Sequence, residues 1–127
     1  MQGIAFICAA SAVSRIRCVD AEDNKLVVLA RATRARTGAA EGAALRDLDG
    51  RTYAGASVDL PSLKVSALGV CIAMAVASGA RGAEAAVVLN EGAFLESELE
   101  PLREFAGAGV PVHHGGPNGT IGDTHST

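Results

Sequence analysis

The stretch GAALRDLDGRTYAGASVD, residues 42–59, decides the fold. It contains two runs suited to β-strands, 42–46 and 51–58, on either side of the four residues DLDG at 47–50. Aspartate at the start and glycine at the end of such a connection are what a type I turn with a bulge requires. The stretch therefore predicts a β-hairpin.

A helix is predicted before this hairpin, from Asp20 to Thr37. Asp20 suits the N-cap position because its carboxylate can accept hydrogen bonds from the first backbone N–H groups. Glu22 and Asp23 fall in the first turn, where negative charge interacts favourably with the helix dipole. Gly38 is typical of the residue at which a helix ends.

A second helix is predicted after the hairpin, from about Ser62 to Ser78. Between Val65 and Ala77 its only polar residue is Ser66, so the helix is apolar on every side. Such a helix must be covered on every side, and each large apolar side chain left in water forfeits roughly 1.5–3 kcal/mol. Because one sheet covers only one face, we expect a homo-oligomer, a dimer or tetramer, formed through the Val65–Ala77 helix.

The remaining elements follow from shorter patterns. Residues 84–89 predict a strand buried on both faces, 96–106 a third helix and 110–113 a short last strand. The glycine-rich and polar residues after this strand predict no regular structure. We therefore divide the chain into an N-terminal extension at 1–19, one domain at 20–114 and a flexible C-terminal tail at 115–127.

Several of these strings resemble the cytidine deaminase family. Residues 42–59 are similar to the family's hairpin, G-A-A-L-x-x-x-D-G-x-x-x-x-G-x-N-x-E, and LARATRAR at 29–36 resembles its opening helix. The resemblance extends from Asp20 to about Val112 and is greatest to short actinobacterial members. It implies an α/β, three-layer cytidine deaminase-like fold with a mixed β-sheet flanked by helices. It also implies a chemistry in which zinc-bound hydroxide hydrolyses the exocyclic amine of cytidine.

The chain departs from the family at the catalytic positions. In the family, zinc is held by one residue of a C/H-A-E string that opens the second helix and by two cysteines of a P-C-x-x-C string that opens the third. Alignment with the first string puts Leu68 at the ligand position and Val70 at the catalytic glutamate. Placing Pro101 on the second string puts Leu102 and Phe105 at the two thiolates. Zinc lowers the pKa of its bound water from about 15.7 to about 7, which no apolar side chain can do, so we expect no metal and no cofactor.

The substrate side of the family pattern is partly retained. The family's N-x-E string, which binds ribose hydroxyls, becomes Ser57-x-Asp59, and Glu41 directly precedes the hairpin. Residues 36–41, where the family carries an aromatic ring that stacks on the pyrimidine, contain none. Two interpretations stay open. These polar residues bind a small nucleoside- or sugar-like ligand, or Ser57 and Asp59 are a polar pair at the end of a strand.

Three other features of the sequence are candidate sites. Neighbours in a strand point to opposite faces, so His113 and His114 cannot chelate one ion, and we expect them to face solvent. Cys71 lies in the apolar helix and is predicted to be a buried, unreactive thiol. The acidic residues between 91 and 104 predict a solvated helix face.

Composition limits the partners and the location. Of the 127 residues 49% are hydrophobic, only 3% are aromatic, and the net charge is −3. Proteins that bind nucleic acid need basic surfaces and aromatic platforms, so nucleic acid is not an expected partner. The three cysteines form no C-x-x-C pair, and the apolar run at 4–10 is far shorter than the ~20 residues that span a bilayer. We expect a cytoplasmic protein that does not enter membranes.

Three functions remain at this point. The favoured one is a non-catalytic deaminase relative that acts by ligand binding or protein association, with an apolar pocket near Leu68, Val70 and Leu102. The alternative is an unorthodox enzyme on the same fold that uses Ser57, Asp59 and polar residues borne by another subunit. The third is a true nucleoside deaminase, which would hold zinc.

Overall fold

The computed structural model describes residues 20–127. The predicted extension at 1–19, with Cys8 and Cys18, lies outside the described residues. None of the helices within 20–127 is long and apolar enough to cross a membrane. In chain order the elements are α2 (Ala21–Thr37), β1 (Gly42–Asp47), β2 (Thr52–Ala56), β3 (Val58–Leu60), β4 (Leu63–Val65), α3 (Ala67–Ala77), β5 (Ala83–Leu89), the 3₁₀ turn η2 (Glu96–Glu98), α4 (Leu99–Ala106), β6 (Pro111–Gly115) and β7 (Ile121–Ser126).

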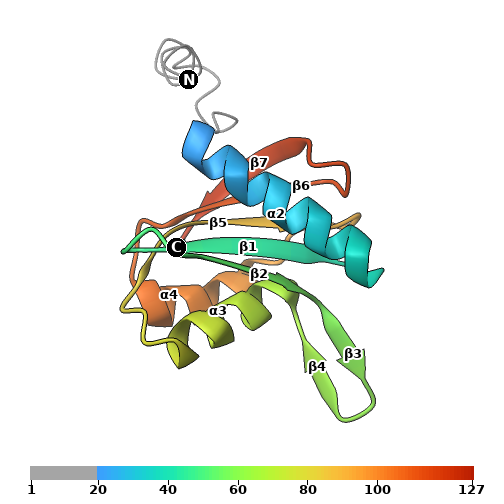
Figure 1. The fold of residues 1–127 in the computed structure, drawn as a ribbon, viewed down its shortest axis with the longest axis horizontal. Coiled ribbons are helices and arrows are strands. Elements are labelled where there is room, and N and C mark those ends of the chain that lie inside the picture. Colours follow the sequence, from blue (N-terminus) through green and yellow to red (C-terminus); the bar gives the residue numbers. More distant parts are fainter. Residues whose placement is uncertain (1–19) are drawn as a thin grey trace.

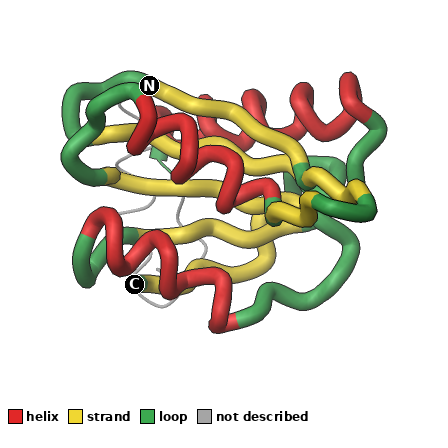
Figure 2. The backbone as a smooth tube through the Cα atoms, turned by 90° about the horizontal axis from the view of Figure 1, so that it is seen from below, coloured by secondary structure: helices red, strands yellow, loops and turns green. Residues whose placement is uncertain are grey.

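Five strands form one mixed sheet in the order β2-β1-β5-β6-β7. The β5–β6 pair is parallel and the other neighbours are antiparallel. Helix α2 covers one face of the sheet, and α3 and α4 cover the other (Figures 1 and 2). The short hairpin of β3 and β4 projects away from these layers (Figure 1). The predicted three-layer α/β fold with a mixed sheet is confirmed.

The core has two halves, because successive strand residues point to opposite faces of the sheet. Val87 of β5 belongs to the cluster under α2, together with Leu26. Its neighbour Val88 belongs to the cluster under α3 and α4, together with Leu68 and Leu102. The run that predicted a strand buried on both faces is therefore β5, and that prediction is confirmed.

Small residues in the hairpin let both helix layers approach the sheet closely. A Cβ atom on Gly42 would lie 2.3 Å from the carbonyl oxygen of Ala30 in α2. A Cβ atom on Gly55 would lie 2.9 Å from Val70 Cγ1 in α3. Real Cβ atoms do not approach other atoms so closely, so a side chain at either position would push a helix away from the sheet. This close packing agrees with a composition in which only 3% of the residues are aromatic.

The first helix and the hairpin turn form as predicted. The Asp20 carboxylate accepts a hydrogen bond from the Asp23 backbone N–H at 2.8 Å, and Gly38 ends α2 with φ of 68°. In the turn between β1 and β2, the Asp47 carboxylate accepts hydrogen bonds from two backbone N–H groups, each at 2.9 Å. Gly50 completes that turn with φ of 86°, a conformation that favours glycine.

The second helix begins later than predicted. It starts at Ala67 rather than Ser62, and the residues before it form the β3–β4 hairpin. Ser66 is the N-cap, since its hydroxyl accepts a hydrogen bond from a first-turn backbone N–H at 3.0 Å. Across the hairpin, Lys64 forms an ion pair with Asp59. Ser62 and Ser66 both suit the N-cap position. The pairing of β3 with β4 involves the residues around Ser62, so the helix begins after Ser66.

The prediction of a flexible tail from residue 115 is wrong. Residues Ile121–Ser126 form β7, which pairs antiparallel with β6 and closes one edge of the sheet. Val112 pairs with His125, and His114 pairs with Asp123. The polar composition was misleading because an antiparallel edge strand needs only one covered face.

Candidate functional site

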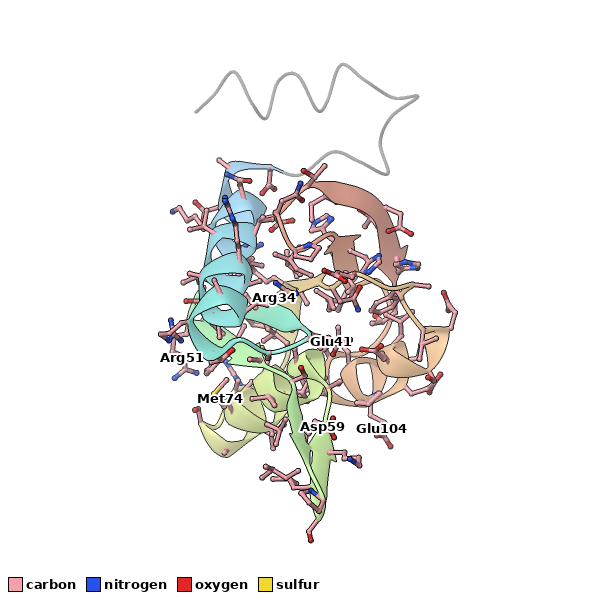
Figure 3. All side chains as sticks on the ribbon, turned by 90° about the vertical axis from the view of Figure 1, so that its right-hand side faces the viewer. Arg34, Glu41, Arg51, Asp59, Met74 and Glu104 are labelled. Atoms are coloured by element: carbon pink, nitrogen blue, oxygen red, sulfur yellow. The ribbon has the colours of Figure 1, made fainter. Side chains whose placement is uncertain are left out.

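A cavity of about 380 Å³ lies where the start of β1, the end of β5 and the segment that leads into η2 meet. Glu41 stands directly before β1, and Asn90 directly follows β5. Arg34 reaches the cavity from α2, and its side chain lies near that of Glu41 (Figure 3). The lining residues are Arg34, Ala40, Glu41, Asn90, Glu91, Gly92, Ala93, Leu95 and Glu98.

Glu41 links this cavity to the N-terminus of α3. Its Oε1 accepts a hydrogen bond from the Ala67 backbone N–H at 3.2 Å, and its Oε2 accepts one from Asn90 Nδ2 at 3.0 Å. The first N–H groups of a helix have no partner within the helix and carry partial positive charge. A carboxylate at this position satisfies one of them. Glu41, singled out from the sequence, is therefore a fixed acceptor in the cavity wall.

Asn90 is held from its other side by His114. The Asn90 Oδ1 atom lies 2.8 Å from His114 Nε2, and His114 Nδ1 lies 3.3 Å from Asp123 Oδ1. The Phe94 ring lies against one histidine of β6 and one of β7, with centroid distances of 5.6 Å to His114 and 4.6 Å to His125. The prediction that both neighbouring histidines face solvent is wrong for His114, which is only partly exposed and hydrogen-bonded on both nitrogens.

Glu98 brings a second carboxyl to the cavity, from the end of η2. Burial, and after it the negative charge of Glu41, raises the pKa of Glu98 above its usual value. Its Oε1 atom is buried and has no hydrogen-bond partner within residues 20–127. The interpretation of this acidic stretch as a fully solvated face is therefore wrong for Glu98. Other members of the stretch, such as Glu100 and Glu104, are exposed.

Ser57 and Asp59 lie beside this cavity rather than in it. They line an adjoining hollow of about 520 Å³, which shares Ala40 with the first. Ser57 is joined to the site by two hydrogen bonds of 3.1 Å, because its Oγ accepts the Glu41 N–H and its own N–H donates to the Glu41 carbonyl. The Asp59 side chain, on the projecting hairpin (Figure 3), is 83% exposed. The structure thus brings Ser57 and Glu41 together and leaves Asp59 at the rim.

The four positions aligned with the family's catalytic residues lie mostly in the core. Leu68 is in the first turn of α3, as aligned, and is 1% exposed. Val70 is partly buried against Gly55. Leu102 and Phe105 are the fourth and seventh residues of α4, which begins at Leu99. The alignment was anchored on Pro101, but the helical segment opens five residues earlier with η2.

A metal does not fit these residues. Within residues 20–127, no group of three or more His, Cys, Asp or Glu side chains is arranged to hold a metal ion. At the start of α3 the aligned ligand position is an apolar side chain packed into the core, and the residues that open η2 include no cysteine. Neither the cavity nor the neighbouring hollow of about 520 Å³ is lined by Leu68, Val70 or Leu102, near which a pocket was expected, and Leu68 and Leu102 are core residues.

Two buried polar or reactive groups lie away from the cavity. Cys71 is a buried free thiol, and burial raises its pKa to about 12, as expected for an unreactive cysteine. His113 is 3% exposed, so the prediction that it faces solvent is wrong. Its Nε2 lies 2.8 Å from Asp23 Oδ2, beneath α2. The two adjacent histidines do point to opposite faces of the sheet, as predicted.

The sequence analysis did not predict that Asn90, His114 and Glu98 meet in this site, although it considered His114 as a metal ligand. A signal for the first two was present, because Asn90 directly follows a buried strand and His114 stands near the end of the next one. Ligands of open α/β sheets commonly bind beyond the carboxyl ends of the strands. No comparable signal distinguished Glu98 from the other acidic residues around it.

Comparisons with known proteins agree with this arrangement of elements. A family model described as cytidine deaminase-like matches residues 19–119. The structure of cytidine deaminase from Burkholderia pseudomallei is similar with a TM-score of 0.65 and 23% identity, covering 81% of this chain and 89% of that one. Cytidine deaminase from Mycobacterium leprae is similar with a TM-score of 0.64 and 20% identity, covering 81% and 91%. At these identities the likeness shows the fold. No curated protein matches the sequence.

Proposed function

The chain belongs to the cytidine deaminase-like family, and we propose that it is a non-catalytic member that binds a small nucleoside- or sugar-like ligand. The observation that carries the proposal is the first turn of α3. Leu68, aligned with the zinc ligand, is packed into the core, while the Glu41 carboxylate accepts a hydrogen bond from the backbone N–H of Ala67 at this helix end. Such a site lacks the means to prepare hydroxide but keeps acceptors that can hold a polar ligand.

The first experiment measures zinc by plasma mass spectrometry and ammonia release from cytidine on the purified full-length protein. We expect zinc far below one equivalent per chain and no ammonia above the uncatalysed background. One equivalent of zinc together with turnover of cytidine would overturn the proposal.

Ligand binding is tested on the same preparation by NMR titration with cytidine, uridine and ribose. We expect shifts confined to residues around Glu41 and Asn90, and loss of those shifts in Glu41→Gln. Glu104→Gln is the matched control, because Glu104 is an exposed glutamate on α4 away from the cavity lining. Equal binding by both variants would place the ligand elsewhere.

One observation favours a second candidate, an unorthodox enzyme in the same cavity. Burial and the neighbouring Glu41 carboxylate raise the pKa of Glu98, and carboxyl groups perturbed in this way cluster at catalytic sites. This candidate predicts turnover of a nucleoside without stoichiometric zinc. In the assay above, ammonia release from metal-free protein would support it and replace the non-catalytic proposal.

We further propose self-association through α3 and a location in the cytoplasm. The sheet and α4 cover only part of α3 and leave Val76 55% exposed. The buried free thiol of Cys71 supports a reducing compartment. Light scattering should show a dimer or tetramer that Val76→Glu converts to monomer. Val28→Glu is the control, because Val28 is equally exposed, at 59%, on the opposite layer. A monomeric wild type would refute self-association.

A further inference from the structure

The amide of Asn90 can stand in only one orientation. A carboxylate is acceptor-only, so the atom of Asn90 that lies 3.0 Å from Glu41 Oε2 must be its NH₂ group. Its carbonyl oxygen then faces His114 Nε2 at 2.8 Å. Because this oxygen is an acceptor, His114 Nε2 must carry the hydrogen. The three side chains form a directed chain of hydrogen bonds that runs from β6 through the end of β5 to the cavity.

This series of hydrogen bonds ends on the Glu41 carboxylate, which can accept further hydrogen bonds. A carboxylate offers about four lone-pair sites, and Glu41 uses two of them, for Ala67 N–H and for Asn90. Glu98 adds an oxygen without a partner among the described residues. Arg34 is the one cation among the lining residues, against the carboxyl groups of Glu41, Glu91 and Glu98, and its Nε donates to the Ala40 carbonyl at 3.2 Å. The cavity is therefore rich in acceptors.

We propose that His114, acting through Asn90, fixes Glu41 as an acceptor and thereby makes the cavity specific for ligands that present hydrogen-bond donors on an amine or amidine nitrogen. The inference rests on the proposed ligand-binding function and names the ligand chemistry. Glu41 and Asn90 line the cavity, whereas His114 does not. His114 is thus a positioning residue, and it sets specificity without touching the ligand.

Loss of the His114 donor has a defined consequence. The Asn90 carbonyl would lose its partner, and the amide could turn to place its oxygen against Glu41. Two acceptors would then face each other, and Glu41 would lose one of the bonds that orient it. The cavity would keep its volume but lose its preference for donors.

Two isosteric probes separate donors from acceptors. Acetamidinium and acetate have the same planar shape, but the first presents only donors and the second only acceptors. In an NMR titration of the full chain, we expect acetamidinium chloride to shift the Asn90 side-chain amide and the Ala67 backbone amide saturably. Sodium acetate should shift neither. Equal binding of both ions, or binding of acetate alone, would overturn the inference.

The role of His114 is tested with two variants. His114→Leu removes the donor and should weaken acetamidinium binding about tenfold, the usual scale for a hydrogen bond within a charged network. His114→Gln places an amide N–H near the position of Nε2 and should restore most of the affinity. A merely structural role would not predict this rescue. Unchanged affinity in His114→Leu, or no rescue by His114→Gln in a folded protein, would refute it.

A second variant covers failure of His114→Leu to fold. Asn90→Asp keeps the shape of the side chain but replaces the donor to Glu41 with an acceptor, and it should abolish acetamidinium binding. Retained binding would overturn the inference. Binding of the probes does not depend on zinc or on turnover. Release of ammonia from cytidine would therefore refute the non-catalytic function without affecting the acetamidinium result.

Discussion

His113 and His114 are neighbours in β6, yet they belong to different layers of the molecule. His113 is buried beneath α2, with Nε2 2.8 Å from Asp23 and Nδ1 2.9 Å from Thr124 Oγ1. His114 faces the other side of the sheet, where Nε2 lies 2.8 Å from Asn90 at the cavity. Because successive side chains of β6 point to opposite faces of the sheet, His113 belongs to the core and His114 belongs to the candidate site.

The two networks differ in where they end. Under α2, Asp23 accepts from both His113 and Arg46, and Arg46 also donates to Glu84 at 2.8 Å. Burial alone would raise the pKa of Asp23, but the hydrogen bonds from His113 and Arg46 outweigh it and hold that pKa below its usual value. None of these four residues lines either of the two cavities described above. The His114 network ends on an acceptor that faces a cavity, which is why only the second is a candidate site.

Removing Asp23 should have the largest effect on stability. Asp23→Ala leaves Arg46 and His113 without their shared carboxylate, and breaking a buried ion pair in this way costs about 3–5 kcal/mol. Urea unfolding measures the loss. Asp123→Ala is the matched control in the other network, where the carboxylate is 48% exposed and its loss should cost less than about 1 kcal/mol. Equal losses would mean that the two networks do not differ as described.

The pH dependence of unfolding checks the same carboxylate. A lowered folded-state pKa gives stability that is present above the unfolded pKa of Asp, about 3.9, and is lost as pH falls through the lower folded value. Between these two values, wild type should lose stability more steeply than Asp23→Asn as pH falls. Parallel curves would exclude a role for Asp23 in acid unfolding.

Replacing each histidine should produce the next largest difference. His113→Leu leaves Asp23 with Arg46 alone and should cost about 2 kcal/mol of unfolding free energy. His114→Leu lies beside a cavity that water can enter, so it should cost less than about 1 kcal/mol while changing ligand preference. The two variants differ by one position and carry the same side chain, so each controls the other. A larger loss of unfolding free energy in His114→Leu than in His113→Leu would mean that His114 is the structural histidine and would contradict its assignment to the site.

Local signals predicted most of the fold. The Asp20 cap, the DLDG turn and the uninterrupted run of β5 each act within a few residues, and the elements they predicted formed. The start of α3 could not be read locally, because Ser62 and Ser66 are equally good caps. Tertiary pairing of β3 with β4 selects Ser66. The polar strand β7 gave no periodic signal because it lies at the sheet edge.

The candidate site was only partly predictable for the same reason. Glu41 was found because it stands next to a recognisable hairpin. Asn90, His114 and Glu98 come from three other elements, and only the parallel pairing of β5 with β6 and the position of η2 bring His114 to Asn90 and Glu98 to the cavity. The alignment of Leu102 and Phe105 rested on Pro101, which is the third residue of α4 and follows η2.

Glu98→Gln should have the smallest effect and an opposite pH dependence. A raised folded-state pKa gives stability that is fully present below the unfolded pKa of Glu, about 4.3, and is lost as pH rises through the higher folded value. Glutamine does not titrate, so the variant should be more stable than wild type near neutral pH. The gain should stay below about 1 kcal/mol, because the carboxyl is partly exposed and salt screens it.

Glu41→Gln tells the two causes of that pH dependence apart. Burial acts on Glu98 in either background, whereas the repulsion from Glu41 disappears in the Glu41→Gln variant. In that background the gain from Glu98→Gln should shrink without vanishing. A gain of unchanged size would mean that the two carboxyls do not interact, and the cavity would then present two independent acceptors rather than a coupled pair.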